Sequence, residues 1–136
     1  MRRGTILATA ASFVVVAVVA TSILVSGLPN EQRAMRADRQ RLADIRAIAV
    51  AVDRHWAELG QLPPDLDAVA TPRRLRRLPV DPVDGSVYEY LVLGDADYSL
   101  CASFDRETRD PALRRFWQHG AGRRCFSFNA AATVLP

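Results

Sequence analysis

Hydrophobic and polar positions divide this chain into three parts with different patterns. Residues 5–28 contain no charged side chain and are predominantly apolar. Residues 39–59 repeat apolar side chains every three or four positions, which is the spacing of one face of an α-helix. Further on, residues 86–93 and 98–104 are rich in β-branched and aromatic side chains, as strands are. The pattern predicts an apolar helix, then an amphipathic helix, then a small sheet.

The first part has the length of a membrane span. A bilayer core requires about 20 apolar residues. A secretory signal has a shorter apolar region, of roughly 7–15 residues, and a small-residue cleavage site, and no clean site follows this run. We therefore expect an uncleaved anchor that contacts membrane lipid through residues 5–28, rather than a cleaved signal.

The amphipathic helix is expected to bury one stripe of side chains. Its members are Leu42, Ile45, Ile48, Ala49, Val52, Trp56 and Leu59. Asn30 offers an N-cap, and Gly60 accepts the left-handed conformation that ends a helix. We expect Trp56 to be largely buried against the sheet. The chain then divides into residues 1–28 (basic N-terminus and transmembrane anchor), 29–60 (juxtamembrane amphipathic helix) and 61–136 (small sheet domain).

Three strands are predicted in the last part. In residues 86–93, Tyr88 and Tyr90 share one face, and Val87 and Glu89 share the other. Residues 98–104 form the returning strand, and residues 125–128 form a third. One or two helical turns are expected within residues 64–69. A long helix packed on a small antiparallel sheet defines an α+β fold.

Two cysteines indicate where the domain lies. Cys101 and Cys125 are not part of a CxxC motif and have no neighbouring His, which disfavours a reactive thiol or a metal site. We expect a structural disulfide between them, and disulfides imply an oxidising compartment. Arg2 and Arg3 favour a cytoplasmic N-terminus. The predicted protein crosses the cytoplasmic (inner) membrane once, with its C-terminal domain on the periplasmic side.

Short motifs run along most of the chain. A basic N-terminus and an apolar helix lead into an amphipathic helix, followed by G-x-L-P, DP-x-x-G-x-x-Y-x-Y and Y-x-L-C-A-x-F motifs. This succession of motifs resembles the superfamily of type IV pilins and type II secretion pseudopilins. The matching positions are Gly60, Leu62, Pro63, Asp81, Pro82, Gly85, Tyr88, Tyr90, Tyr98, Leu100, Cys101, Ala102 and Phe104. The resemblance implies a pilin-like fold, no enzymatic activity, and partners among other envelope or pilin-like proteins.

The N-terminus departs from the family pattern. Family members carry a leader that ends in Gly, followed by Phe and then by Glu at the fifth mature position. Here Gly4 follows two arginines, but Thr5 stands where the Phe would be and Thr9 where the Glu would be. This departure favours a minor or tip component, or a stand-alone anchored protein, over a major filament subunit.

Charge excludes one class of partner. Arg2 and Arg3 supply two of the three net positive charges, so the rest of the chain carries only +1. Nucleic-acid-binding domains concentrate basic charge, and we therefore expect no nucleic-acid partner. The candidate interaction patch, for anionic lipid or an acidic partner, consists of Arg73, Arg74, Arg76 and Arg77. The alternative, which we favour, is a solvated face with Leu75 and Leu78 buried beneath it.

Candidate ligand chemistry is sparse. Some pseudopilins bind calcium near the hairpin, where this chain has Asp81, Asp84, Asp95 and Asp97. No EF-hand spacing accompanies these residues, and Asp is common in turns, so no cofactor is expected. His55, at the edge of the helix stripe, and His119, in a Gly-flanked loop, are expected to have ordinary polar or packing roles. An anchored module that senses calcium or another ligand remains the alternative function.

Overall fold

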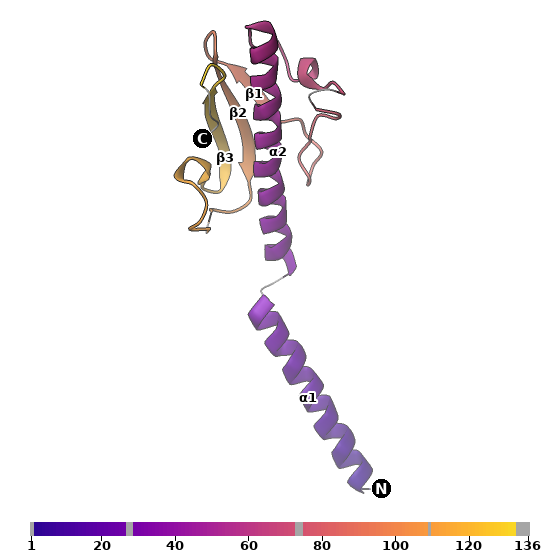
Figure 1. Cartoon of the computed structure of the whole chain (residues 1–136). Coiled ribbons are helices and arrows are strands. Elements are labelled where there is room, and N and C mark those ends of the chain that lie inside the picture. The colour runs from indigo at the N-terminus through magenta and orange to yellow at the C-terminus, as the bar shows by residue number, and fades with distance from the viewer. Residues whose placement is uncertain (1, 27–28, 73–74, 109, 133–136) are drawn as a thin grey trace. The chain divides into compact units, whose positions relative to one another are not determined.

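The computed structural model describes residues 2–26, 29–72, 75–108 and 110–132 (Figure 1). The chain forms two compact units, Met1–Arg33 and Ala34–Pro136. The helices and strands are α1 (Arg2–Ser26), α2 (Pro29–Leu59), β1 (Glu89–Val92), β2 (Asp97–Phe104) and β3 (Gly122–Asn129). Two short 3-10 helices lie at Asp67–Val69 and Arg115–Trp117. The order of elements confirms the predicted α+β layout.

The apolar helix α1 dominates the first unit. Among the described residues, one stretch of helix near the N-terminus is long and apolar enough to cross a membrane by length and composition. Its hydroxyl groups are satisfied within the helix, because Thr9, Ser12, Thr21 and Ser22 each donate to a carbonyl oxygen three or four residues earlier at 2.7–2.9 Å. Such back-bonding lets hydroxyl side chains occupy an apolar environment without a further acceptor.

The second unit is a helix packed on a sheet. The three strands are antiparallel in the order β1-β2-β3, and Glu89, Cys101 and Cys125 lie in one register across them. Figure 1 shows the sheet along one side of α2 and the segment between α2 and β1 along the other side. Gly60 ends α2 as predicted, with a φ of 68° and its N–H on the Trp56 carbonyl at 2.7 Å. The long helix is thus covered from two directions.

The core forms between α2 and the inner face of the sheet. Ile45, Ile48, Val52, Tyr98 and Leu100 have no measurable exposure. The Tyr98 hydroxyl is buried too, and it donates to the carboxylate of Asp53 at 2.9 Å. Leu66 and Val69 are buried at the predicted helical turn. The alternation in β2 is confirmed, since every second side chain from Tyr98 to Phe104 enters this core.

The expectation for the end of the helix stripe was wrong. Trp56 is only partly buried, and Leu59 is 56% exposed. His55, placed at the edge of the stripe, is 5% exposed instead. Because α2 is covered on two sides, it buries an arc wider than one stripe. Its buried residues are Ala37, Asp38, Arg41, Leu42, Asp44, Ile45, Ile48, Ala49, Ala51, Val52 and His55.

The strand boundaries also differ from the prediction. β1 is shorter than expected, and Val87 forms an isolated bridge with Val80. β3 is longer, because β2 pairs with it over its full length from Asp97 to Phe104. Trp117, which was not assigned to the core, is 3% exposed and packs with its ring centroid 5.3 Å from that of Phe126.

Candidate functional site: the Arg41 centre

A buried polar site is built around Arg41 on α2. Arg41 is 4% exposed, and its Nε and Nη2 atoms donate to the two carboxylate oxygens of Asp81 at 2.6 and 3.1 Å. Asp81 is itself 8% exposed and begins the turn that leads into β1. This two-point contact is the geometry in which a guanidinium fork binds a carboxylate most strongly.

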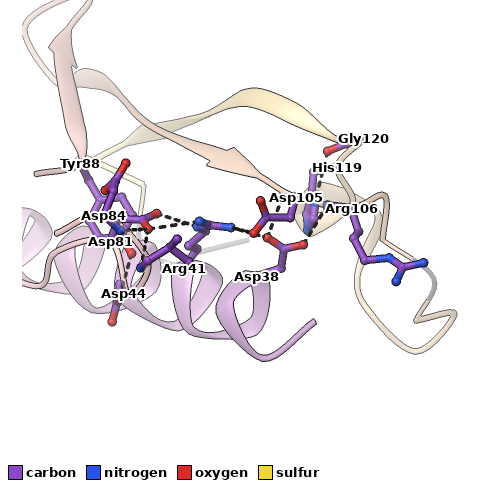
Figure 2. A network of polar contacts seen from close by, with 11 residues as sticks. Asp38, Arg41, Asp44, Asp81, Asp84, Tyr88, Asp105, Arg106, His119 and Gly120 are labelled. Atoms are coloured by element: carbon purple, nitrogen blue, oxygen red, sulfur yellow. Dashed lines mark hydrogen bonds and ion pairs between the residues drawn. The ribbon is translucent and has the colours of Figure 1, made fainter. Parts of the chain in front are cut away.

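Two further carboxylates complete the Arg41 centre. Arg41 Nη1 donates to Asp38, one helical turn earlier, and to Asp105, just after β2, each at 2.7 Å. Asp38 also accepts the backbone N–H groups of Asp105 and Arg106 at 2.9 and 3.0 Å. Figure 2 shows Arg41 between Asp81 on one side and the Asp38–Asp105 pair on the other. One arginine therefore joins α2 to two loops.

The turn that carries Asp81 is ordered by its own hydrogen bonds. Asp81 Oδ1 accepts the N–H of Val83 at 2.8 Å. The Asp81 carbonyl accepts the N–H of Gly85 at 2.9 Å, and the Asp81 N–H donates to Ser86 at 2.8 Å. Gly85 has a φ of 73°, a conformation that L side chains rarely adopt. The predicted turn is confirmed, and its hydrogen bonds help to orient the Asp81 carboxylate toward Arg41.

Opposite charges and burial determine the electrostatics of the Arg41 centre. The hydrogen bonds from Arg41 hold the pKa of the Asp81 carboxyl below its usual value, against a smaller opposing effect of burial. The same carboxylates raise the pKa of Arg41. Nearby, burial and then the hydrogen bond to Asp44, at 2.8 Å, raise the pKa of the Tyr88 hydroxyl. These groups therefore keep their ordinary charge states at neutral pH.

This arrangement is suited to holding the fold together. The Nε, Nη1 and Nη2 atoms of Arg41 already donate to carboxylates, so the guanidinium is committed to internal partners. A cavity of about 200 Å³ adjoins Arg41 and extends toward Ser86, Glu89 and Arg123. Ordinary small-molecule sites have volumes of about 300–1,000 Å³. The Arg41 centre therefore positions loops rather than presenting a ligand pocket.

The structure describes only part of the predicted arginine patch. Arg73 and Arg74 lie outside the described residues, while Arg76 and Arg77 are exposed beside the partly buried Leu75 and Leu78.

The four turn aspartates do not form one site. Asp81 is committed to Arg41, and Asp97 accepts a hydrogen bond from Asn129 at 2.7 Å. Within the described ranges, no group of three or more His, Cys, Asp or Glu residues could hold a metal ion. The structure thus removes Asp81 from the calcium hypothesis, because a carboxylate neutralised by a guanidinium is a poor ligand for a cation.

The two remaining candidates are a histidine and the cysteine pair. His119 is 7% exposed, and its ring stacks on Phe104 with centroids 3.7 Å apart. The His119 carbonyl accepts the Thr108 N–H at 2.8 Å, and the His119 N–H donates to Thr108 Oγ1 at 2.9 Å, which fixes its loop, so a packing role fits. Cys101 and Cys125 form the predicted disulfide, which joins β2 to β3 with Cα atoms 4.0 Å apart.

Sequence reasoning missed the Arg41 centre. Asp38, Arg41 and Asp44 recur at steps of three, which places them near one another on the helix. That spacing was a usable signal, but charged residues next to a membrane anchor are usually solvated. Their partners, Asp81 and Asp105, are distant in the chain, and only the fold brings them close.

Comparisons with known proteins identify no relative. No protein-family model, curated protein or solved structure matches this chain.

Proposed function

We propose that this protein is a membrane-anchored, non-enzymatic interaction component of an envelope secretion or pilus-type assembly, with a pilin-like domain displayed outside the cytoplasmic membrane. The observation that carries the proposal is the succession of elements: an apolar helix, the long helix α2 and a three-stranded antiparallel sheet packed along α2. The resemblance to pilins and pseudopilins implies the same succession. The proposal assigns the domain a role in contacting proteins.

The composition of α1 supports the anchor. The helix contains no acidic residue, and its apolar side chains are exposed, for example Phe13 at 76% and Leu24 at 84%. Exposed apolar side chains of this kind suit lipid rather than water. The internally bonded hydroxyls of Thr9, Ser12, Thr21 and Ser22 lower the cost of burial in the bilayer further.

The disulfide supports placement of the domain in an oxidising compartment. Protease added to spheroplasts should therefore digest the domain while leaving α1 in the membrane. A cytoplasmic protein serves as the control for intact cells. Full protection of the domain under these conditions would overturn the topology.

An exposed apolar surface supports a protein partner. The apolar turn surface, as we name it, comprises Val80, Val83 and Val87, each between 46% and 68% exposed, with Val80 and Val87 paired in a β-bridge. Clusters of this kind on a soluble domain usually mark interaction sites. Cross-linking in native membranes, followed by mass spectrometry, should capture an envelope protein through this surface at fixed stoichiometry. Cross-links that scatter over the whole domain would count against the proposal.

The alternative of a ligand or calcium sensor has less support. The cavity beside Arg41 is small, and Asp81 is neutralised by the arginine. Calcium titration of the full-length protein, monitored by thermal unfolding, separates the two functions. A calcium-dependent rise in the unfolding temperature would favour the sensor over the interaction component.

The missing acidic residue bears on filament assembly. In the family, the Glu is thought to pair with the N-terminal amine of a neighbouring subunit, and an unpaired charge is costly in an apolar setting. Thr9 occupies the corresponding position here. The wild-type protein should therefore remain in the membrane fraction as a monomer or small complex. Abundant wild-type protein in sheared filaments, processed after Gly4, would contradict the assignment to a minor or stand-alone role.

A further inference from the structure

The disulfide lies in a rung that spans the whole sheet. Glu89 of β1, Cys101 of β2 and Cys125 of β3 occupy one register, so the disulfide runs from the central strand to an outer strand. Cys101 is 3% exposed, whereas Cys125 is partly exposed. The two cysteine residues therefore differ in exposure and in their neighbouring strands.

This rung makes the two ends of the disulfide unequal toward a nucleophile. Thiol–disulfide exchange proceeds by attack of a thiolate on one sulfur while the other departs. The line of attack on Cys101 comes from the β1 side, where Glu89 and Arg123 form an ion pair and Arg123 Nη2 lies 3.5 Å from Cys101 Sγ. The line of attack on Cys125 comes from beyond β3, and in the described part of the chain no strand pairs with that edge. Among the described residues, no paired strand therefore covers the approach to Cys125, although the cavity beside Arg41 reaches Cys101.

Arg123 adds a second asymmetry. Its Nη2 atom donates to Cys101 Sγ at 3.5 Å, and Glu89 holds the guanidinium through contacts at 2.7 and 3.0 Å. A neighbouring arginine stabilises the thiolate form of a cysteine. A better-stabilised thiolate is also the better leaving group in exchange. Arg123 therefore makes the Cys101 thiolate the better leaving group of the two.

We propose that the Cys101–Cys125 disulfide is an exchange site with a fixed direction, which accepts an external thiolate at Cys125. The incoming sulfur forms a bond to Cys125 Sγ while the bond between the two cysteines breaks. Its electron pair leaves on Cys101 Sγ, beside Arg123. One disulfide is consumed and one is formed, so no further oxidant or reductant is required. The partner is a thiolate, either of a small thiol or of a C-x-x-C oxidoreductase.

The backbone pairing of β2 with β3 should hold the sheet together after the disulfide exchanges. β2 and β3 pair continuously from Asp97–Asn129 to Phe104–Gly122, so the two strands are held by backbone hydrogen bonds on both sides of the disulfide. Exchange removes one covalent link from an already paired ladder. The mixed-disulfide form should therefore keep the native fold, which a disulfide that joined otherwise unpaired loops would not guarantee.

The site of attack can be determined directly. The full-length protein in detergent is treated with reduced glutathione, quenched with acid and alkylated with N-ethylmaleimide, and its peptides are mapped by mass spectrometry. We expect glutathione on Cys125 and the maleimide on Cys101, with an unchanged far-UV circular dichroism spectrum. Adducts mainly on Cys101, or no adduct on the folded protein, would overturn the proposal.

Two neighbouring arginines provide matched variants for measuring the rate of thiol–disulfide exchange. Arg123→Gln removes the charge beside Cys101, and Arg124→Gln removes the same charge on the other face of β3, where its guanidinium lies 5.9 Å from the Phe126 ring centroid. We expect exchange about threefold slower in Arg123→Gln than in Arg124→Gln. The difference should narrow in ~1 M salt, because the Arg123 side chain is 56% exposed. Equal rates for the two variants would remove Arg123 from the mechanism and overturn the directional proposal.

A second arm distinguishes the sources of the thiolate. A purified C-x-x-C oxidoreductase, with its second cysteine replaced by Ser, should accumulate as a mixed disulfide on Cys125. Faster trapping of this protein than of glutathione at equal thiolate concentration would identify a protein partner. The reverse order would identify small thiols, and both results support attack at Cys125. Absence of the Cys125 adduct in both arms would reject the site.

Discussion

Arg41 and Asp81 are forty residues apart in the chain, and their side chains meet in a buried two-point contact at 2.6 and 3.1 Å. The contact joins the N-terminal half of α2 to the turn that precedes β1. Because Asp38 and Asp105 bind the same guanidinium, the Arg41 centre also joins the end of β2. One arginine therefore joins the helix to the segments before β1 and after β2.

Asp81→Asn should destabilise the domain. The change leaves Arg41 buried without its two-point partner, and breaking a buried ion pair costs about 3 kcal/mol or more of unfolding free energy. Asp95→Asn, at an exposed turn residue, should cost less than about 0.5 kcal/mol. Urea unfolding of the full-length protein in detergent measures both values. Equal effects of the two changes would show that the Arg41 centre does not stabilise the fold.

The contribution of Asp81 should disappear in acid. Its pKa is lower in the folded protein than in the unfolded chain, where it is about 3.9. Its stabilising contribution is therefore fully present above about pH 5, and it is lost as the pH falls through the unfolded value and then the folded value. The difference in unfolding free energy between wild type and Asp81→Asn should shrink as the pH falls from about 5 to about 3. A constant difference would contradict a charged Asp81.

The two tryptophans should differ in their effect on stability. Trp117 is 3% exposed and contacts Phe126 and Arg46, so Trp117→Ala should cost about 3–5 kcal/mol. Trp56 is only partly buried at the margin of the core, and Trp56→Ala should cost about 1–2 kcal/mol. Equilibrium unfolding followed by circular dichroism gives both values without relying on tryptophan fluorescence. The reverse order would mean that the exposure of these side chains does not govern their contribution.

The apolar turn surface should bind a partner without stabilising the fold. The double change Val83→Ser and Val87→Ser removes two side chains that are 68% and 60% exposed. We expect unfolding free energy to change by less than about 0.5 kcal/mol and cross-linking in native membranes to be lost. Val50→Ser, on α2 at 36% exposure, is the control and should keep the cross-links. Unchanged cross-linking in the double variant would assign the contact to another face.

Much of the local structure could be predicted from the chain, because it depends on neighbouring residues. The end of α2 at Gly60, the turn that begins at Asp81 and the alternation along β2 all follow from local conformational preference and side-chain spacing. The disulfide could be predicted because the chain offers a single pairing of two cysteines. The helix α1 could likewise be predicted, because its residues form a long apolar run.

The sequence by itself determined which segments are helix, turn and strand, and which pair of cysteines is joined. Only the tertiary structure decided that α2 is covered on two sides, and this is why His55 is buried while Trp56 lies at the margin. It also decided that Arg41 meets Asp81 and Asp105, and that Arg123 lies beside Cys101. The physical reason is that periodicity reports one face of one element, whereas the burial of a charge depends on partners that the folded chain brings from a distance.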